Sequence, residues 1–158
     1  MKNKNLISKL NIIFAIVLFA FAIVFIFVEP QFFAIWINKK QDAGLEGLGI
    51  LALMLLGIYC AAGVIITGIL NLVSGITIKK ANSIGKEKAW SIVSVVVDFI
   101  TAAIFVYWLV LVIDLYTGGI VTKIIYAIMA LASIGLAVLQ IVSLSKKAPK
   151  TEEIIVEE

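Results

Sequence analysis

Four long apolar blocks dominate the sequence, and they restrict the chain to a membrane fold. They cover residues 10–28, 47–78, 89–113 and 120–144, and each is near or above the roughly 18–20 residues that a helix needs to cross the hydrocarbon core of a bilayer. Of all residues 63% are hydrophobic and 15% are charged, whereas a soluble domain is about half apolar and a quarter charged. We therefore predict one all-α transmembrane domain, 1–144, followed by a charged cytoplasmic tail, 145–158.

The first apolar block has one feature of a secretory signal. Ala20-Phe21-Ala22 has the small residues of a signal-peptidase cleavage site. The apolar run continues beyond this point to Val28, however, and it ends at a proline, Pro30, whose preceding residue is disfavoured in a helix. We therefore expect the block to be retained as the first membrane helix.

The distribution of lysines predicts the orientation. All 13 basic residues are lysines, and only Lys39, Lys40 and Lys123 lie on one side of the predicted membrane. The others lie in the N-terminal segment, the connection between the second and third blocks, and the tail. Because short cytoplasmic loops are enriched in basic residues, we expect a multi-pass protein of the plasma membrane with both termini in the cytoplasm. The lysine-only, isoleucine-rich composition hints at a bacterial source.

Small and polar residues recur at spacings of three and four along each block. Helices in lipid associate through close packing and interhelical hydrogen bonds, so these stripes predict the contact faces of an up-down, left-handed four-helix bundle. The glycines of the second block are interpreted as packing positions, with a pore hinge as the alternative. The stripes contain Ser8, Asn11, Ala15, Leu18 and Ala22; Gly57, Ala61, Val64, Gly68, Asn71 and Gly75; Ser91, Ser94, Asp98 and Thr101; and Tyr126, Ala130, Ser133, Ala137 and Gln140.

Four polar residues of these stripes are predicted to form an intramembrane cluster, namely Asn71, Asp98, Thr101 and Gln140. At the rise of an α-helix, Asn71, Asp98 and Gln140 lie about 9–15 Å inside the cytoplasmic end. Asp98 carries the most weight, because an aspartate at this depth costs roughly 2.5–3.5 kcal/mol on insertion scales. It is either a structural hydrogen-bonding group, with Asn71, Ser94 or Thr101 as partner, or a site for a cation or proton.

The first outer connection and the tail each offer a possible contact. The connection is apolar and aromatic in its first half, which predicts a short interfacial anchor or a surface that holds a neighbour. The end of the tail is either a disordered acidic segment or a docking peptide for a cytoplasmic partner. The anchor residues are Phe32, Phe33 and Trp36, and the docking residues are Ile154, Ile155 and Val156.

The sequence carries no signature of catalysis. It has no histidine, which removes the commonest general base and metal ligand, and no phosphate-binding loop. We therefore expect neither an enzyme nor a cofactor, and the scattered lysines do not predict nucleic-acid binding. The expected partners are the lipid bilayer and either another membrane protein or further copies of the chain. The predicted function is that of a subunit, scaffold or anchor of a membrane assembly. The alternative is a small oligomeric channel or transporter that uses Asp98 for a cation or proton.

Overall fold

A computed structural model describes residues 4–27, 46–115 and 120–145, with side chains for 4–23, 55–110 and 123–145. This part of the chain is all helical and contains no strand. The helices are α1 (Lys4–Phe27), α3 (Glu46–Lys80), α4 (Ile84–Leu115) and α5 (Ile120–Ser145). The predicted interfacial anchor at Phe32, Phe33 and Trp36 lies outside the described residues. So does the predicted docking segment Ile154, Ile155 and Val156.

The helices are longer than the apolar blocks at most of their ends. The first helix begins at Lys4 and not at residue 10, and α4 begins at Ile84 and not at 89. The apolar blocks mark only the stretch that lipid would cover, whereas backbone hydrogen bonds continue the helix into its polar flanks. The extension matters for α1, because it places Asn11 well inside the helix and away from its end.

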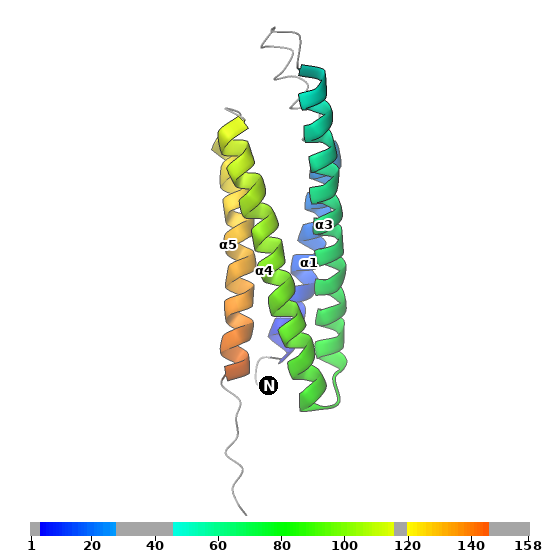
Figure 1. The fold of residues 1–158 in the computed structure, drawn as a ribbon. Helices are drawn as coiled ribbons and strands as arrows, with labels where there is room; N and C mark the ends of the chain where they lie inside the picture. The colour runs from blue at the N-terminus through cyan, green and yellow to red at the C-terminus, as the bar shows by residue number, and fades with distance from the viewer. Residues whose placement is uncertain (1–3, 28–45, 116–119, 146–158) are drawn as a thin grey trace, which may run out of the picture.

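The four helices form an elongated bundle in which successive helices run antiparallel (Figure 1). The most extensive packing joins α1 to α3 and α4 to α5, followed by α3 to α4, whereas α1 and α5 touch over a small area. The start of α1, the α3–α4 turn and the end of α5 lie at the same end of the bundle (Figure 1).

The α3–α4 turn is fixed by hydrogen bonds that its sequence supplies. Ser83 is the N-cap of α4: its Oγ accepts from the Lys86 backbone N–H at 3.3 Å, and its carbonyl oxygen accepts the first helical bond, from Glu87 N–H at 3.1 Å. A serine cap satisfies donors that have no partner in the first helical turn. From α1, Lys4 Nζ donates to the Ala81 carbonyl oxygen at 2.8 Å, so the start of α1 is bound to this turn.

The bundle has polar residues inside and apolar residues outside. Asn11, Asn71, Asp98 and Gln140 are fully buried. Many large apolar side chains of the four helices are instead exposed, among them Ile16, Ile66, Ile92 and Leu131. This is the reverse of a soluble domain, in which water favours polar surfaces. Within the described residues, four stretches are long and apolar enough to cross a membrane: Lys4–Ile23, Leu55–Lys80, Ile84–Val110 and Lys123–Ser145.

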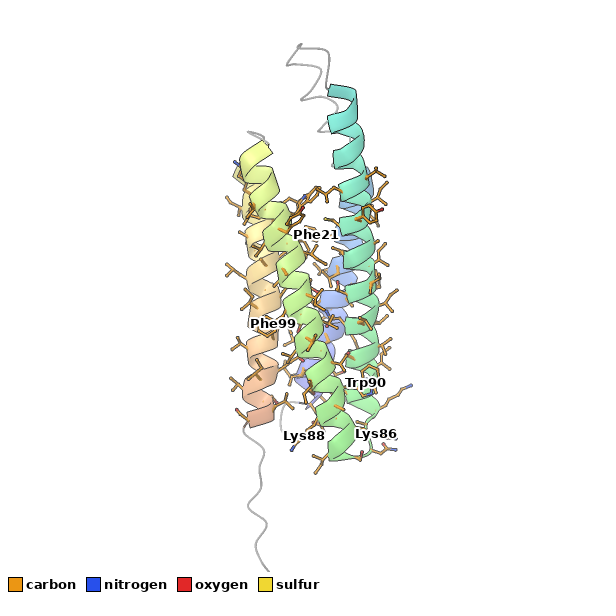
Figure 2. All side chains as sticks on the ribbon, in the orientation of Figure 1. Phe21, Lys86, Lys88, Trp90 and Phe99 are labelled. Carbon is orange, nitrogen blue, oxygen red and sulfur yellow. The ribbon has the colours of Figure 1, made fainter. Side chains whose placement is uncertain are left out.

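An aromatic cluster fills the half of the bundle remote from the α3–α4 turn. Phe21 of α1 packs edge-on against Phe105 of α4, with ring centroids 5.5 Å apart and planes at 86°, and Figure 2 shows it reaching from α1 towards α4. The Tyr126 ring of α5 lies 6.3 Å from that of Phe105. Trp108 is also buried in this core. The buried polar residues Asn11, Asn71, Asp98 and Gln140 occupy the other half.

Candidate functional site: a buried polar network

The predicted polar cluster lies inside the bundle. Asn71 of α3, Asp98 and Thr101 of α4 and Gln140 of α5 each have 0% of their surface exposed. Gln140 Nε2 donates to Asp98 Oδ2 at 2.9 Å, so the carboxyl group of α4 is bound directly to the amide of α5. The predicted partner of Asp98 was Asn71, Ser94 or Thr101. The structure shows Gln140 bonded to Asp98 and Asn71 interacting with the same carboxyl group, whereas Thr101 Oγ1 donates to the Val97 carbonyl oxygen of its own helix at 2.8 Å.

Two further residues complete the network. Asn11 of α1 donates through Nδ2 to Ser94 Oγ of α4 at 2.8 Å, and Ser94 Oγ donates to Asn71 Oδ1 of α3 at 3.3 Å. Gln140 Nε2 also donates to Asn11 Oδ1 at 3.1 Å. The hydrogen bonds therefore connect all four helices, including α1 and α5, which pack over the smallest area of the neighbouring pairs.

The carboxyl group of Asp98 fixes which side-chain atom donates and which accepts in each hydrogen bond of this network. Because a carboxyl oxygen accepts the bond, Gln140 presents its NH₂ group, and both hydrogens of that group are used, on Asp98 and Asn11. Asn11 then accepts through Oδ1 and presents its own NH₂ group to Ser94. Ser94 passes its hydroxyl hydrogen to Asn71 Oδ1, so the Asn71 NH₂ group remains at the end of the series.

Four buried polar atoms near this series have no hydrogen-bond partner among the described residues. They are Asp98 Oδ1, Gln140 Oε1, Asn71 Nδ2 and, one turn further along α3, Ser74 Oγ. The Asn71 side chain interacts with the Asp98 carboxyl group, although its Nδ2 atom meets no partner within strict hydrogen-bond geometry. Buried polar groups in proteins are almost always satisfied by protein or by ordered water, so these atoms mark the place where the network is open.

Ser91 and Ser133, two buried serines of the stripes, are satisfied within their own helices. Ser91 donates to the Glu87 carbonyl oxygen, and Ser133 donates to that of Met129 at 2.8 Å. A serine that bonds the carbonyl oxygen four residues earlier presents little polarity to a neighbour. Ser91 and Ser133 therefore act as small packing residues and do not belong to the interhelical network. Residue type alone does not show this, because Ser94 is also a serine and does belong to it.

Two of the predicted packing positions, Gly68 and Gly75, lie where α3 meets α1. Gly57, Ala61, Gly68 and Gly75 are all buried. A Cβ atom added at Gly75 would lie 3.0 Å from the Ser8 carbonyl oxygen, and Ser8 Oγ donates to the Gly75 carbonyl oxygen at 2.7 Å. A Cβ atom at Gly68 would lie 3.2 Å from Cε1 of Phe19. The two backbones approach closely because neither glycine carries a side chain.

Among the residues with described side chains, no three of His, Cys, Asp and Glu come together as metal ligands. The polar network thus contains one carboxyl group, three amides and one hydroxyl group. This set can donate and accept hydrogen bonds, and its oxygen atoms can bind water or a hard cation, but it contains no nucleophile paired with a base.

Comparisons with protein-family models, with curated proteins and with solved structures give no match for this chain.

The predicted cluster omitted two residues of the network, Ser94 on α4 and, on α1, Asn11. It follows Lys9 closely in the sequence, so a count from that lysine places it near the membrane surface. In the structure Lys9 is exposed on the side of the helix, and α1 begins at Lys4. Asn11 therefore lies about 10 Å from the helix start, at 1.5 Å per residue. A lysine side chain is long enough to reach the membrane interface from a position inside a helix. This reach of Lys9 was the sequence signal for the depth of Asn11.

Proposed function

We propose that this chain is a non-enzymatic integral membrane protein that acts as a subunit, scaffold or anchor of a membrane assembly. One observation carries the proposal: the deep polar groups, including Asp98, make hydrogen bonds from helix to helix, and their side chains are fully buried. Polar groups used in this way fix the register and rotation of the helices. A rigid bundle with an apolar exterior is suited to lateral contact with lipid and with other membrane proteins.

The position of the lysines supports an orientation with both termini in the cytoplasm. Lys79, Lys80, Lys86 and Lys88 are exposed at the end of the bundle that carries the α3–α4 turn, and Figure 2 shows Lys86 and Lys88 there. The start of α1 and the end of α5 lie at the same end. Basic residues favour the cytoplasmic side of a membrane, so we assign this end to the cytoplasm and propose the plasma membrane as the location.

A second candidate function is a small oligomeric channel or transporter that uses Asp98 for a cation or proton. The observation that favours it is the pair of unpartnered oxygen atoms, Asp98 Oδ1 and Gln140 Oε1. Ionisable residues within membrane helices commonly belong to ion or proton paths. Against it, Asp98 has 0% of its surface exposed, and no lysine is among the buried side chains of the described residues.

The substitution Asp98→Asn separates the two candidates. Asparagine keeps an oxygen that can accept from Gln140 and removes the titratable group. For a subunit we expect an unchanged thermal midpoint, within the error of the measurement, and unchanged assembly. For a transporter, proton or cation flux in proteoliposomes would be present in the native protein and lost in a well-folded Asp98→Asn variant. That loss would refute the proposed function.

Two further measurements complete the test. Asp98→Leu removes the acceptor, and because interhelical hydrogen bonds in membranes are modest we expect a loss of stability of about 0.5–2 kcal/mol. Native mass spectrometry after extraction in a mild detergent reports the assembly. A companion protein at fixed stoichiometry supports the subunit, whereas a homo-oligomer with measurable flux supports the channel.

A further inference from the structure

Two exposed lysines and a half-buried tryptophan flank the turn that joins α3 to α4. Lys80 ends α3, and Lys86 lies in the first turn of α4, beyond the short turn 81–83. Trp90 follows Lys86 by four residues, so it lies on the same side of α4, about 6 Å further along the helix axis. We propose that Lys80, Lys86 and Trp90 form a binding site for an anionic phospholipid.

The packing of α4 on α3 fixes the side of α4 on which these residues lie. A Cβ atom added at Gly63 of α3 would lie 3.0 Å from Cδ1 of Ile104, so Ile104 adjoins α3. Lys86 precedes Ile104 by 18 residues, which is about five turns of helix, and the two therefore share a side of α4. Figure 2 agrees, because it shows Lys86 and Trp90 on the side of α4 next to α3 and Lys88 on the other side.

The exposed charges of residues 79–90 are all positive. Lys79, Lys80, Lys86 and Lys88 are exposed, and none of the four forms an ion pair with another described residue. Glu87 is the acidic residue of this stretch, and only 6% of its surface is exposed, with its Oε1 atom fully buried. Its carboxyl group therefore does not neutralise the surface, and the lysines can bind an anionic group from outside the bundle.

A phospholipid matches both the charge and the apolar part of this surface. Its phosphate group binds the ammonium groups of Lys80 and Lys86, and Trp90 lies one turn deeper, where tryptophan rings meet the headgroup region. Val73 and Val93 lie seven residues from Lys80 and Lys86 respectively, about two turns deeper on the same sides of α3 and α4. Both valines are exposed and can contact an acyl chain, at a depth that a soluble anion or a cytoplasmic protein does not reach.

The site rests on the membrane location proposed above but not on the role of Asp98, so a subunit and a channel could both carry it. Quenching of Trp90 fluorescence by brominated lipids tests it. The chain has three tryptophans, and Trp36→Phe with Trp108→Phe leaves Trp90 alone. This protein is reconstituted into phosphatidylcholine vesicles that contain equal small fractions of either brominated phosphatidylglycerol or brominated phosphatidylcholine. We expect several-fold stronger quenching by the anionic lipid. If the double substitution lowers the helical circular dichroism signal, the difference between the native and Trp90→Phe proteins gives the same quantity.

Lys88→Ala is the matched control, because it removes the same charge from the same part of α4 but on the other side of the helix (Figure 2). The preference for the anionic lipid should be largely lost in Lys80→Ala and in Lys86→Ala and should persist in Lys88→Ala. Equal quenching by the two lipids in the starting protein overturns the proposal and leaves the lysines to an acidic protein surface. Equal losses in Lys86→Ala and Lys88→Ala indicate a general attraction of the charged end to anionic vesicles, and this result also overturns the site.

Discussion

Adding one methyl group at Gly75 should weaken the bundle, although the same change at Gly135 should strengthen it. A Cβ atom at Gly75 would lie 2.9 Å from Cγ1 of Ile12 and 3.0 Å from the Ser8 carbonyl oxygen. The Ile12 side chain can turn away, but the Ser8 oxygen is part of the α1 backbone, so α1 itself must move. At Gly135 a Cβ atom would meet nothing within 4 Å.

The magnitude follows from three contributions to the free energy of unfolding. Alanine is favoured over glycine in a helix by about 0.5–1 kcal/mol, and both substitutions gain this amount. At Gly75 overpacking costs about 1–3 kcal/mol. Displacement of α1 also breaks the 2.7 Å hydrogen bond from Ser8 Oγ to the Gly75 carbonyl oxygen, at a cost of about 0.6 kcal/mol. We therefore expect Gly75→Ala to be less stable than Gly135→Ala by about 1.5–3.5 kcal/mol.

Reversible unfolding in mixed micelles, followed by circular dichroism as the share of denaturing detergent rises, measures this difference. Ser8→Ala serves as a further control, because it removes the hydrogen bond without adding a methyl group and should cost only about 0.6 kcal/mol. Equal stability of the Gly75→Ala and Gly135→Ala proteins would refute the close approach of α1 and α3. A loss in Ser8→Ala as large as that in Gly75→Ala would instead attribute the effect to the hydrogen bond.

Three further predictions concern other parts of the chain. In a Cys60→Ser background, a cysteine at Asn38 should react with an impermeant reagent from outside intact cells and a cysteine at Ser83 only after lysis; reaction of both from outside would contradict the orientation. Asn11→Leu should lower the free energy of unfolding by about 1–2 kcal/mol, more than any change at an exposed apolar position, and an unchanged stability in a detergent titration would exclude α1 from the network. Deletion of 151–158 should leave membrane insertion intact and remove a companion protein from native mass spectra, whereas an unchanged spectrum would leave the tail without a docking role.

The sequence predicted the helices well because the relevant signal is local. An apolar block long enough to cross a bilayer has one regular backbone that satisfies its own hydrogen bonds, the α-helix. The ends of the helices were harder to predict, because hydropathy indicates the stretch that lipid would cover and not the residue at which backbone hydrogen bonding stops. For this reason α1 begins at Lys4 and not at residue 10.

The buried polar network could be predicted only in part from the sequence. Spacing along a helix places Asn71, Asp98 and Gln140 on inward faces, because residues three or four apart share a side of the helix. Which amide meets the carboxyl group depends on how far each helix slides and turns against its neighbours. A shift of one residue is about 1.5 Å and 100°, enough to exchange Gln140 for Asn71 as the partner of Asp98. Contacts between different helices set that shift.

The unequal packing of the helix pairs has a consequence for biogenesis. Because α1 packs most extensively on α3 and α4 on α5, the first hairpin can assemble while the ribosome is still making the second. At that stage Asn11 and Asn71 have no access to Ser94 or Gln140, their partners on α4 and α5. In a membrane, the half-made protein would therefore leave the Asn11 and Asn71 amides without these bonds until α4 supplies Ser94 and α5 supplies Gln140. Such a surface would offer polar contacts to membrane chaperones and proteases until Ser94 and Gln140 pack against it.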